Sequence, residues 1–307
     1  MKPPLASAAL ALALALPSLA AAQAPPGPMA RARYSLPWNL RPAIAPNLLR
    51  VDHAMAFVGS TSVNANAPSA LNTATIFTGG ARPFAAVPDL GLYGRLGLVT
   101  NGVDGADTRA AFVNPVLFAL WTPQVAAGVR LPVFLGVTVP VGPGSDSSAA
   151  QRAAFGSGVY TRQAMDNAMF AGNYFTVMGG AGVSWMGHGL TAQAEFTVLQ
   201  LTRVWGESVD VDESRTNFTV GAHVGYQVIP WLTVSVEAHY QHWLSTPKVV
   251  AANDLFRSQL TLGGGVRGNF PVGTALLRPG VAFFVPAGGP MGAMDYKILQ
   301  FDLAVPL

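Results

Sequence analysis

Strict alternation of apolar and polar side chains is the feature that most constrains this chain. From Leu232 to Gln241 all ten positions alternate, with apolar residues at even numbers and polar residues at odd numbers. A β-strand points successive side chains to opposite faces, so this stretch predicts a strand with one apolar and one polar face. Residues 218–228 alternate in the same way, and only Ile229, Pro230 and Trp231 separate the two stretches. Together they predict a β-hairpin.

Comparable stretches of about 10–15 residues recur along the chain and predict further strands. They lie at 89–100, 128–141, 174–185, 190–204, 258–270, 275–286 and 296–307, with a first strand at 47–58 and a weaker one, apolar on both faces, at 112–121. Long connections are expected at 101–111, 142–173, 205–215, 246–256 and 287–295, and short turns between the remaining neighbours. This up-and-down order leaves one strand missing, for which Asn72 to Gly79 is the candidate. The expected total is twelve strands.

Composition restricts the class of protein. The 307 residues are 50% hydrophobic and 11% charged, and the net charge is +3. Disordered chains have the opposite balance, and the scattered basic residues do not suit nucleic acid. There is no cysteine, which excludes disulfides and thiolate metal sites. After the N-terminal region no apolar run is long enough for a membrane-spanning helix.

The N-terminus predicts export. Lys2 precedes an apolar run from Leu5 to Leu16, and small residues end at Ala22, as in a secretory signal peptide; a membrane anchor is the alternative. The expected organisation is a signal peptide at 1–22, a Pro-rich N-terminal periplasmic segment at 23–46 and a transmembrane barrel at 47–307. Eleven strand residues tilted in a barrel rise about 28 Å, enough for a bilayer core. The fold class is therefore all-β: one antiparallel transmembrane β-barrel with short periplasmic turns and long outer loops.

The last strand alternates Lys297, Leu299, Phe301, Leu303, Val305 and Leu307 on one face. It resembles the final strand of Gram-negative outer-membrane barrels, which implies outer-membrane lipid and the barrel assembly machinery as partners. Leu307 in place of a terminal aromatic residue, and Pro306, depart from that pattern. The run Val137 to Gly142, followed by a long loop, resembles the phenol-degradation (meta-pathway) transporters, a barrel family akin to the fatty-acid transporters.

The polar strand faces are expected to line the lumen. The charged and histidine positions on these faces are Arg95, Arg130, Glu195, His223, Glu237, His239, Arg267, Arg278 and Asp302. Turn positions predict that His223 lies opposite Glu237 and that Arg267 lies opposite Arg278, with Asp302 as counter-charge. An acidic wall facing an arginine wall would orient a polar solute; alternatively, the charges pair across the lumen and make the barrel rigid.

Two segments outside the strands bear on the lumen. Loop 142–173 is the expected gate: Asp146 or Ser147 caps a helix that Gly156 stops, and a second helix after Thr161 carries Met165, Met169 and Phe170 on one side. The segment 23–46 is expected to be a linker or periplasmic tail. The alternative is that it enters the lumen, where Arg31, Arg33 and Arg41 would meet Glu195 and Glu237.

Phe134 and Phe284 fall on the inward phase and suggest an apolar track for a hydrophobic or aromatic solute, or packing against a plug. The sequence thus predicts an outer-membrane channel for passive uptake of small solutes, which it does not identify. The alternative is a structural or surface-interaction barrel with a plugged lumen. A lipid hydrolase would need a serine beside His242 on the lipid face, and none is evident, so no enzyme is expected. No cofactor, metal or nucleic acid is expected either.

Overall fold

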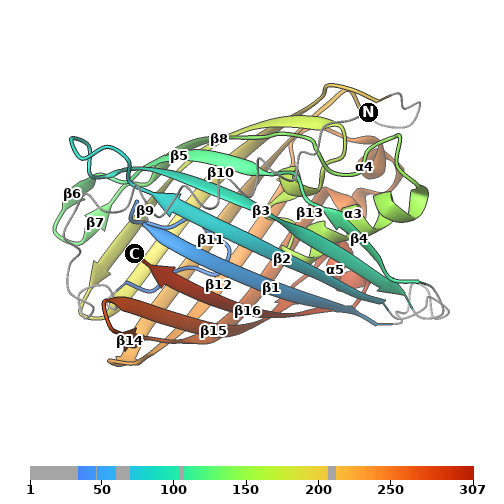
Figure 1. Ribbon diagram of the computed structural model, residues 1–307. Coiled ribbons are helices and arrows are strands. Elements are labelled where there is room, and N and C mark those ends of the chain that lie inside the picture. The colour runs from blue at the N-terminus through green and yellow to red at the C-terminus, as the bar shows by residue number, and fades with distance from the viewer. Residues whose placement is uncertain (1–33, 46, 60–69, 104–106, 207–211) are drawn as a thin grey trace.

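The computed structural model describes residues 34–45, 47–59, 70–103, 107–206 and 212–307; the predicted signal peptide lies outside these ranges. Its strands form one antiparallel sheet that closes into a barrel of twelve wall strands (Figure 1). Closure joins β1 to β16, in register from Leu48 opposite Pro306 to Val58 opposite Tyr296. The expected fold class and strand number are confirmed, including the strand around residues 72–79.

Sixteen strand segments build this wall. They are β1 (Leu48–Val58), β2 (Ala70–Ala81), β3 (Leu90–Val103), β4 (Arg109–Phe112), β5 (Val116–Trp121), β6 (Gln124–Ala126), β7 (Val129–Arg130), β8 (Val133–Thr138), β9 (Tyr174–Gly187), β10 (Leu190–Arg203), β11 (Ser214–Ile229), β12 (Leu232–Trp243), β13 (Ser258–Gly268), β14 (Phe270–Val272), β15 (Ala275–Pro286) and β16 (Tyr296–Pro306). The helices are α3 (Ala149–Thr161), α4 (Lys248–Ala252) and α5 (Gly289–Ala293), with 3₁₀ turns η2 (Asn167–Phe170) and η3 (Asp254–Arg257).

Two wall strands are interrupted at proline, which has no N–H to donate to a ladder. Pro115 lies between β4 and β5, and Pro132 lies between β7 and β8. Each interrupted pair follows one course along the wall, and β6 and β14 are short additions to neighbouring strands. The weak pattern at 112–121 is thus a strand broken near its middle.

The barrel is polar inside and apolar outside. On β12 the inward residues Thr233, Ser235 and Glu237 are buried, while the outward Val234 and Val236 are exposed. Such exposed apolar residues recur around the wall, as expected of a surface that meets lipid. No helix in the described ranges is both long and apolar enough to cross a bilayer.

The two ends of the barrel differ, and we call them the turn end and the loop end. The C-terminus and β14 lie at the turn end, while α3, α4 and α5 gather at the loop end (Figure 1). At the turn end His188 and Gly189 join β9 to β10 with φ of 52° and 79°, the left-handed pair that a tight hairpin requires. Loop 142–173 enters the barrel from the loop end.

The helices of loop 142–173 differ from the expected ones. Ser148, not Asp146 or Ser147, caps α3 through a capping box with Gln151. The helix continues through Gly156, because a single glycine costs only about 1 kcal/mol in a helix and packing outweighs it. Instead of a second helix after Thr161, Gln163 and Ala164 adopt positive φ, and only the turn η2 follows.

One predicted register is wrong. Arg267 lies opposite Gly280, not Arg278, and Phe270 lies opposite Leu277. The cause is the length of the turn: Val272 lies opposite Ala275, so only Gly273 and Thr274 form the turn instead of residues 271–274. The predicted pairing of His223 with Glu237 is found, although a bulge follows Gln227.

Barrel closure can be tested with disulfides, because the chain has no cysteine of its own. Met55 and Leu299 lie directly opposite each other on β1 and β16, and opposed Cα atoms at about 4.5–5.5 Å are within disulfide reach. M55C/L299C should oxidise nearly completely, as measured by free-thiol titration and gel mobility. M55C/L303C is the control, since Leu303 lies opposite Val51. Equal oxidation of both variants would contradict this closure.

Candidate functional site: a lumen filled from both ends

The first described residues, 34–45, lie inside the barrel. Ser35 N donates to Thr191 Oγ1 at 3.0 Å, and Ala45 N donates to Thr122 Oγ1 at 2.9 Å, both near the turn end. Between these anchors the segment rises into the lumen and returns to β1. For residues 34–45 this placement is the alternative weighed for the Pro-rich segment; residues 23–33 and 46 lie outside the described ranges. We call residues 34–45 the inner segment.

Glu237 holds the middle of the inner segment. Its carboxylate accepts hydrogen bonds from the backbone N–H groups of Trp38 and Asn39. On its other side it lies 2.9 Å from His223 Nδ1 and 2.7 Å from His239 Nε2. All of these groups are buried, so one carboxylate ties the inner segment to β11 and β12.

Arg41 is the second anchor. Its side chain forms an ion pair with Glu195 and a 3.1 Å hydrogen bond to Thr197 Oγ1. The guanidinium also lies over the rings of Phe118 and Phe134, 4.4 and 4.0 Å from their centroids. Phe134 therefore packs against the inner segment in this structure. Arg31 and Arg33, which were considered with Arg41, lie outside the described residues.

Arginines on the opposite wall bind the segment's carbonyl groups. Arg267 forms an ion pair with Asp302, donates to Leu36 O and stacks on Trp38 at 4.0 Å. Arg278 donates to Tyr34 O at 2.8 Å. Asp302 thus serves as counter-charge to Arg267 as expected, but it forms no ion pair with Arg278.

Arg50 and Asp52 complete this arginine wall, although sequence reasoning did not select them. Arg50 lies 3.1 Å from Asp302, forms an ion pair with Asp52 and donates to Pro37 O at 2.7 Å. Both sit on the inward phase of β1 and are buried. Arg50 and Asp52 are two residues apart, as residues on the same face of a strand are. This spacing was the sequence signal that could have identified them as lumenal.

Glycines on the wall make room for the inner segment. A Cβ on Gly221 would lie 2.1 Å from Leu40 Cδ2, and a Cβ on Gly225 would lie 1.9 Å from Ser35 Oγ. At these two positions the space is occupied by the chain's own N-terminal residues.

Loop 142–173 fills the other half of the lumen, and an ionic link holds it there. Asp166 forms ion pairs with Arg95 on β3 at 2.8 Å and with Arg162 at 3.0 Å. Arg95 also donates to Asn39 O at 3.3 Å, and Asn39 Nδ2 donates to Gln163 Oε1 at 2.8 Å. The loop and the inner segment therefore meet inside the barrel.

The charge on Asp166 persists at neutral pH. Burial alone would raise the pKa of its carboxyl, but Arg95 and Arg162 lower it below the ordinary value of 3.8. A depressed pKa means that the link stabilises the folded loop above that value and is lost only as the pH falls below it.

Asn114 fixes the base of the loop and was missed by sequence reasoning. Its amide donates to Ala171 O at 2.8 Å and Ala168 O at 3.1 Å, and its oxygen accepts from Gly142 N at 2.8 Å. The Asn-Pro pair in the middle of a strand pattern was a signal for a break. Around it, Met165, Met169 and Phe170 of the predicted gate are all buried.

The structure brings most of the predicted lumen residues together, with one exception. Arg130 keeps the inward phase of β8 and lies opposite Ser184. It sits at the rim of the turn end, where it pairs with Asp89 at 2.7 Å and is partly exposed. Phe284 is fully buried and stacks on His239, with ring centroids 5.7 Å apart. Trp243, the last residue of β12, is partly buried and packs against the hydrophobic cluster near the loop end.

A serine does lie beside His242, contrary to expectation. Ser258 Oγ is 2.7 Å from His242 Nδ1 on the outward face, and the Tyr240 hydroxyl lies 3.2 Å from Ser258 Oγ. In the part of the chain that the structure describes, no carboxylate or amide side chain contacts the His242 ring. A histidine without such a partner lacks the group that orients it in hydrolytic triads.

No family model and no curated protein sequence matches the chain. Among solved structures, an outer membrane channel from Pseudomonas putida F1 aligns over 89% of this chain and 100% of its own, with 13% identity and a TM-score of 0.57. The KdgM porin in complex with disordered oligogalacturonate aligns over 85% and 99%, with 8% identity and a TM-score of 0.48. The chain has the fold of an outer-membrane β-barrel. At such identities the likeness extends to the fold alone.

Replacing Glu237 by Gln should lower the free energy of unfolding by about 3–5 kcal/mol, since the NH2 group of an amide cannot accept the hydrogen bonds that the second carboxylate oxygen receives, and the buried negative charge is lost. Urea unfolding of the refolded protein in detergent micelles measures this. Lys297→Gln removes an exposed pair with Asp295 and should change stability by less than about 0.5 kcal/mol. A loss for Glu237→Gln as small as the control's would contradict the anchoring role.

Proposed function

We propose that the protein is a passive channel for small solutes in the outer membrane of a Gram-negative bacterium, closed in this structure by the inner segment and loop 142–173. The observation that carries the proposal is the polarity of the wall behind the inner segment. Thr191, Gln193 and Glu195 on β10, and Thr233 and Ser235 on β12, point into the lumen. Such a wall is suited to water once the segment leaves.

The contacts that close the lumen support movement. The inner segment is held mainly by hydrogen bonds and ion pairs, each of which water can replace at a modest net cost of about 0.5–3 kcal/mol. A permanently filled interior is usually apolar and close-packed. The outer-membrane location rests on the exposed apolar wall and on the barrel fold, with the turn end in the periplasm.

The second candidate function is a structural or surface-interaction barrel that never opens. The near-complete burial of Glu237, Arg267 and Asp302 favours it, because paired charges inside a closed space stiffen the wall. The channel proposal includes the resemblance to phenol-degradation transporters and the passage of hydrophobic or aromatic solutes. In that proposal, Phe134 and Phe284 would be uncovered when the inner segment moves.

Removing both obstructions should open the pore. Since the two fillings lie in series, deleting residues 34–45 and loop residues 145–171 together should raise single-channel conductance by more than the sum of the separate deletions. The loop cut is geometrically simple, since a Cβ on Gly172 would lie 3.5 Å from Gly144 Cα. Planar-bilayer recording of the mature protein is the measurement.

Gly221→Val is a milder variant for the same measurement. In the protein that lacks loop residues 145–171, it should displace Leu40 and raise conductance without deleting any residue of the inner segment. Gly94→Ala in the same background, whose closest contact would be a flexible leucine methyl at 3.2 Å, should not. A doubly deleted barrel that inserts correctly and stays silent would contradict the channel and favour the structural alternative.

We also propose that the protein is not an enzyme. Although Ser258 and His242 are in contact, no carboxylate or amide side chain among the described residues orients the imidazole as a general base. The refolded protein should show no phospholipid hydrolysis above that of His242→Ala and Ser258→Ala variants in mixed micelles, with or without calcium. Hydrolysis by the parent protein that both variants abolish would overturn this proposal.

A further inference from the structure

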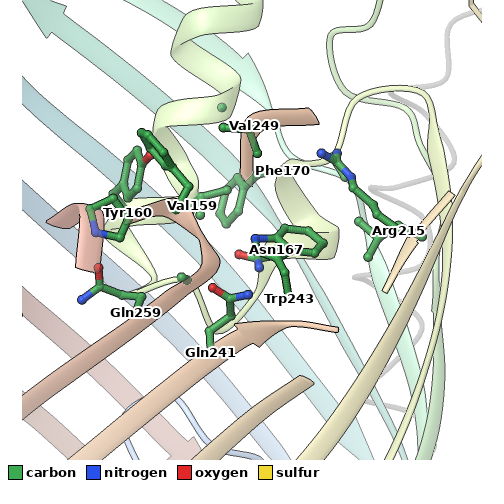
Figure 2. A pocket seen from close by; sticks show the side chains of 15 residues that line it. Val159, Tyr160, Asn167, Phe170, Arg215, Gln241, Trp243, Val249 and Gln259 are labelled. Atoms are coloured by element: carbon green, nitrogen blue, oxygen red, sulfur yellow. The ribbon is translucent and has the colours of Figure 1, made fainter. Parts of the chain in front are cut away.

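A cavity of about 320 Å³ lies at the loop end, between loop 142–173 and the wall. Side chains reach it from α3 and η2 on one side and from β11, β12 and β13 on the other (Figure 2). Its volume is at the lower end of the range of small-molecule sites, about 300–1,000 Å³. One compact ligand would fill it.

Aromatic rings form much of the lining. Phe170 and Tyr160 come from the loop, and Trp243 and Phe256 come from β12 and η3. Phe170 and Trp243 lie near each other in the cavity, with Asn167 between the loop and the wall (Figure 2). Flat faces of this kind favour a planar apolar body.

Arg215 supplies a positive charge that the described protein leaves without an ion pair. It stacks over Tyr174 at 4.3 Å and lies 5.5 Å from the Trp243 ring centre, and its Nε is buried with no hydrogen-bond partner. Arg41, Arg95 and Arg267, by contrast, each bind a carboxylate. The Asp212 carboxylate attracts Arg215 but accepts from the Lys248 backbone N–H instead.

A second polar group in the lining also has an atom without a hydrogen-bond partner. Asn167 is buried, and its Oδ1 has no hydrogen-bond partner in the described structure. Gln259, by contrast, is engaged, since it donates to Gly288 O at 2.8 Å and accepts from Met291 N at 2.9 Å. The cavity thus offers a guanidinium, a free amide oxygen and aromatic walls in one partly open space.

We propose that this cavity binds a small organic carboxylate with a flat apolar body. The carboxylate pairs with Arg215, as arginine's planar fork favours, and the apolar body packs between Phe170 and Trp243. The inference that such carboxylates pass through the pore rests on the channel function proposed above. The inference that the cavity binds them does not.

Because Phe170 and Asn167 belong to the loop while Arg215 and Trp243 belong to the wall, the ligand bridges the two. Its occupancy and the position of the loop are therefore coupled, in the sense that a ligand favours the conformation it contacts best.

Calorimetric titration of the refolded mature protein with benzoate, and with benzamide as its neutral counterpart, tests the site. Benzoate should bind saturably, and Arg215→Gln should weaken it at least tenfold while changing benzamide binding little. Arg109→Gln, which alters an exposed arginine paired with Asp107, should leave both unchanged.

Gly156→Leu keeps the test decisive if Arg215→Gln fails to fold. Gly156 lines the cavity, and a Cβ there would meet nothing within 4 Å, so a leucine would fill the space without a clash and should abolish binding of both probes. Absence of saturable benzoate binding to the parent protein, or equal binding to all variants, would overturn the proposal. Titration in detergent needs no open pore, so either result leaves the conductance measurement independent.

Discussion

Backbone hydrogen bonding in a surrounding without water is the constraint on which the rest of this structure depends. A sheet whose outer face is apolar cannot leave the edges of β1 and β16 unpaired in lipid, since each orphaned N–H or C=O costs several kcal/mol. The pairing of β1 with β16 along their whole length removes both edges. Closure also sends every polar strand face inward, so it creates a polar interior that must be either wet or filled.

The protein fills that interior with its own chain, and charge distribution decides how. Glu195 and Glu237 face N–H groups and Arg41 of the inner segment, while Arg267 and Arg278 face its carbonyl oxygens. An extended segment without regular secondary structure carries unpaired donors and acceptors, and the two walls satisfy them from opposite sides. Two alternatives were considered for the lumenal charges: a field across the lumen, or a rigid interior of paired charges. The same walls give the paired interior when the inner segment is in place and the field when it is absent.

The strand pattern was predictable because lipid and lumen impose opposite requirements on alternate residues. The expected ends of β15 coincide with the observed ones, and those of β10 differ by one residue. Register was less accessible, since a turn of two residues, Gly273 and Thr274, in place of the expected four moved Arg267 away from Arg278. The loop interior was least predictable: Gly156 failed to stop α3 because contacts with the barrel outweigh helix propensity, and no local pattern announces that Asp166 meets Arg95, 71 residues away.

The position of the inner segment in the chain bears on assembly. Trp38 N and the Glu237 carboxylate that receives it are 199 residues apart, and Arg278 binds Tyr34 across 244 residues. The first part of the described chain therefore finds its partners only after the last third has formed strands. Contacts of such long sequence separation form slowly, and the pairs that close the barrel, such as Leu48 with Pro306, are farther apart still. Closing the wall and filling its interior are therefore both late events, and both wait for the same C-terminal strands.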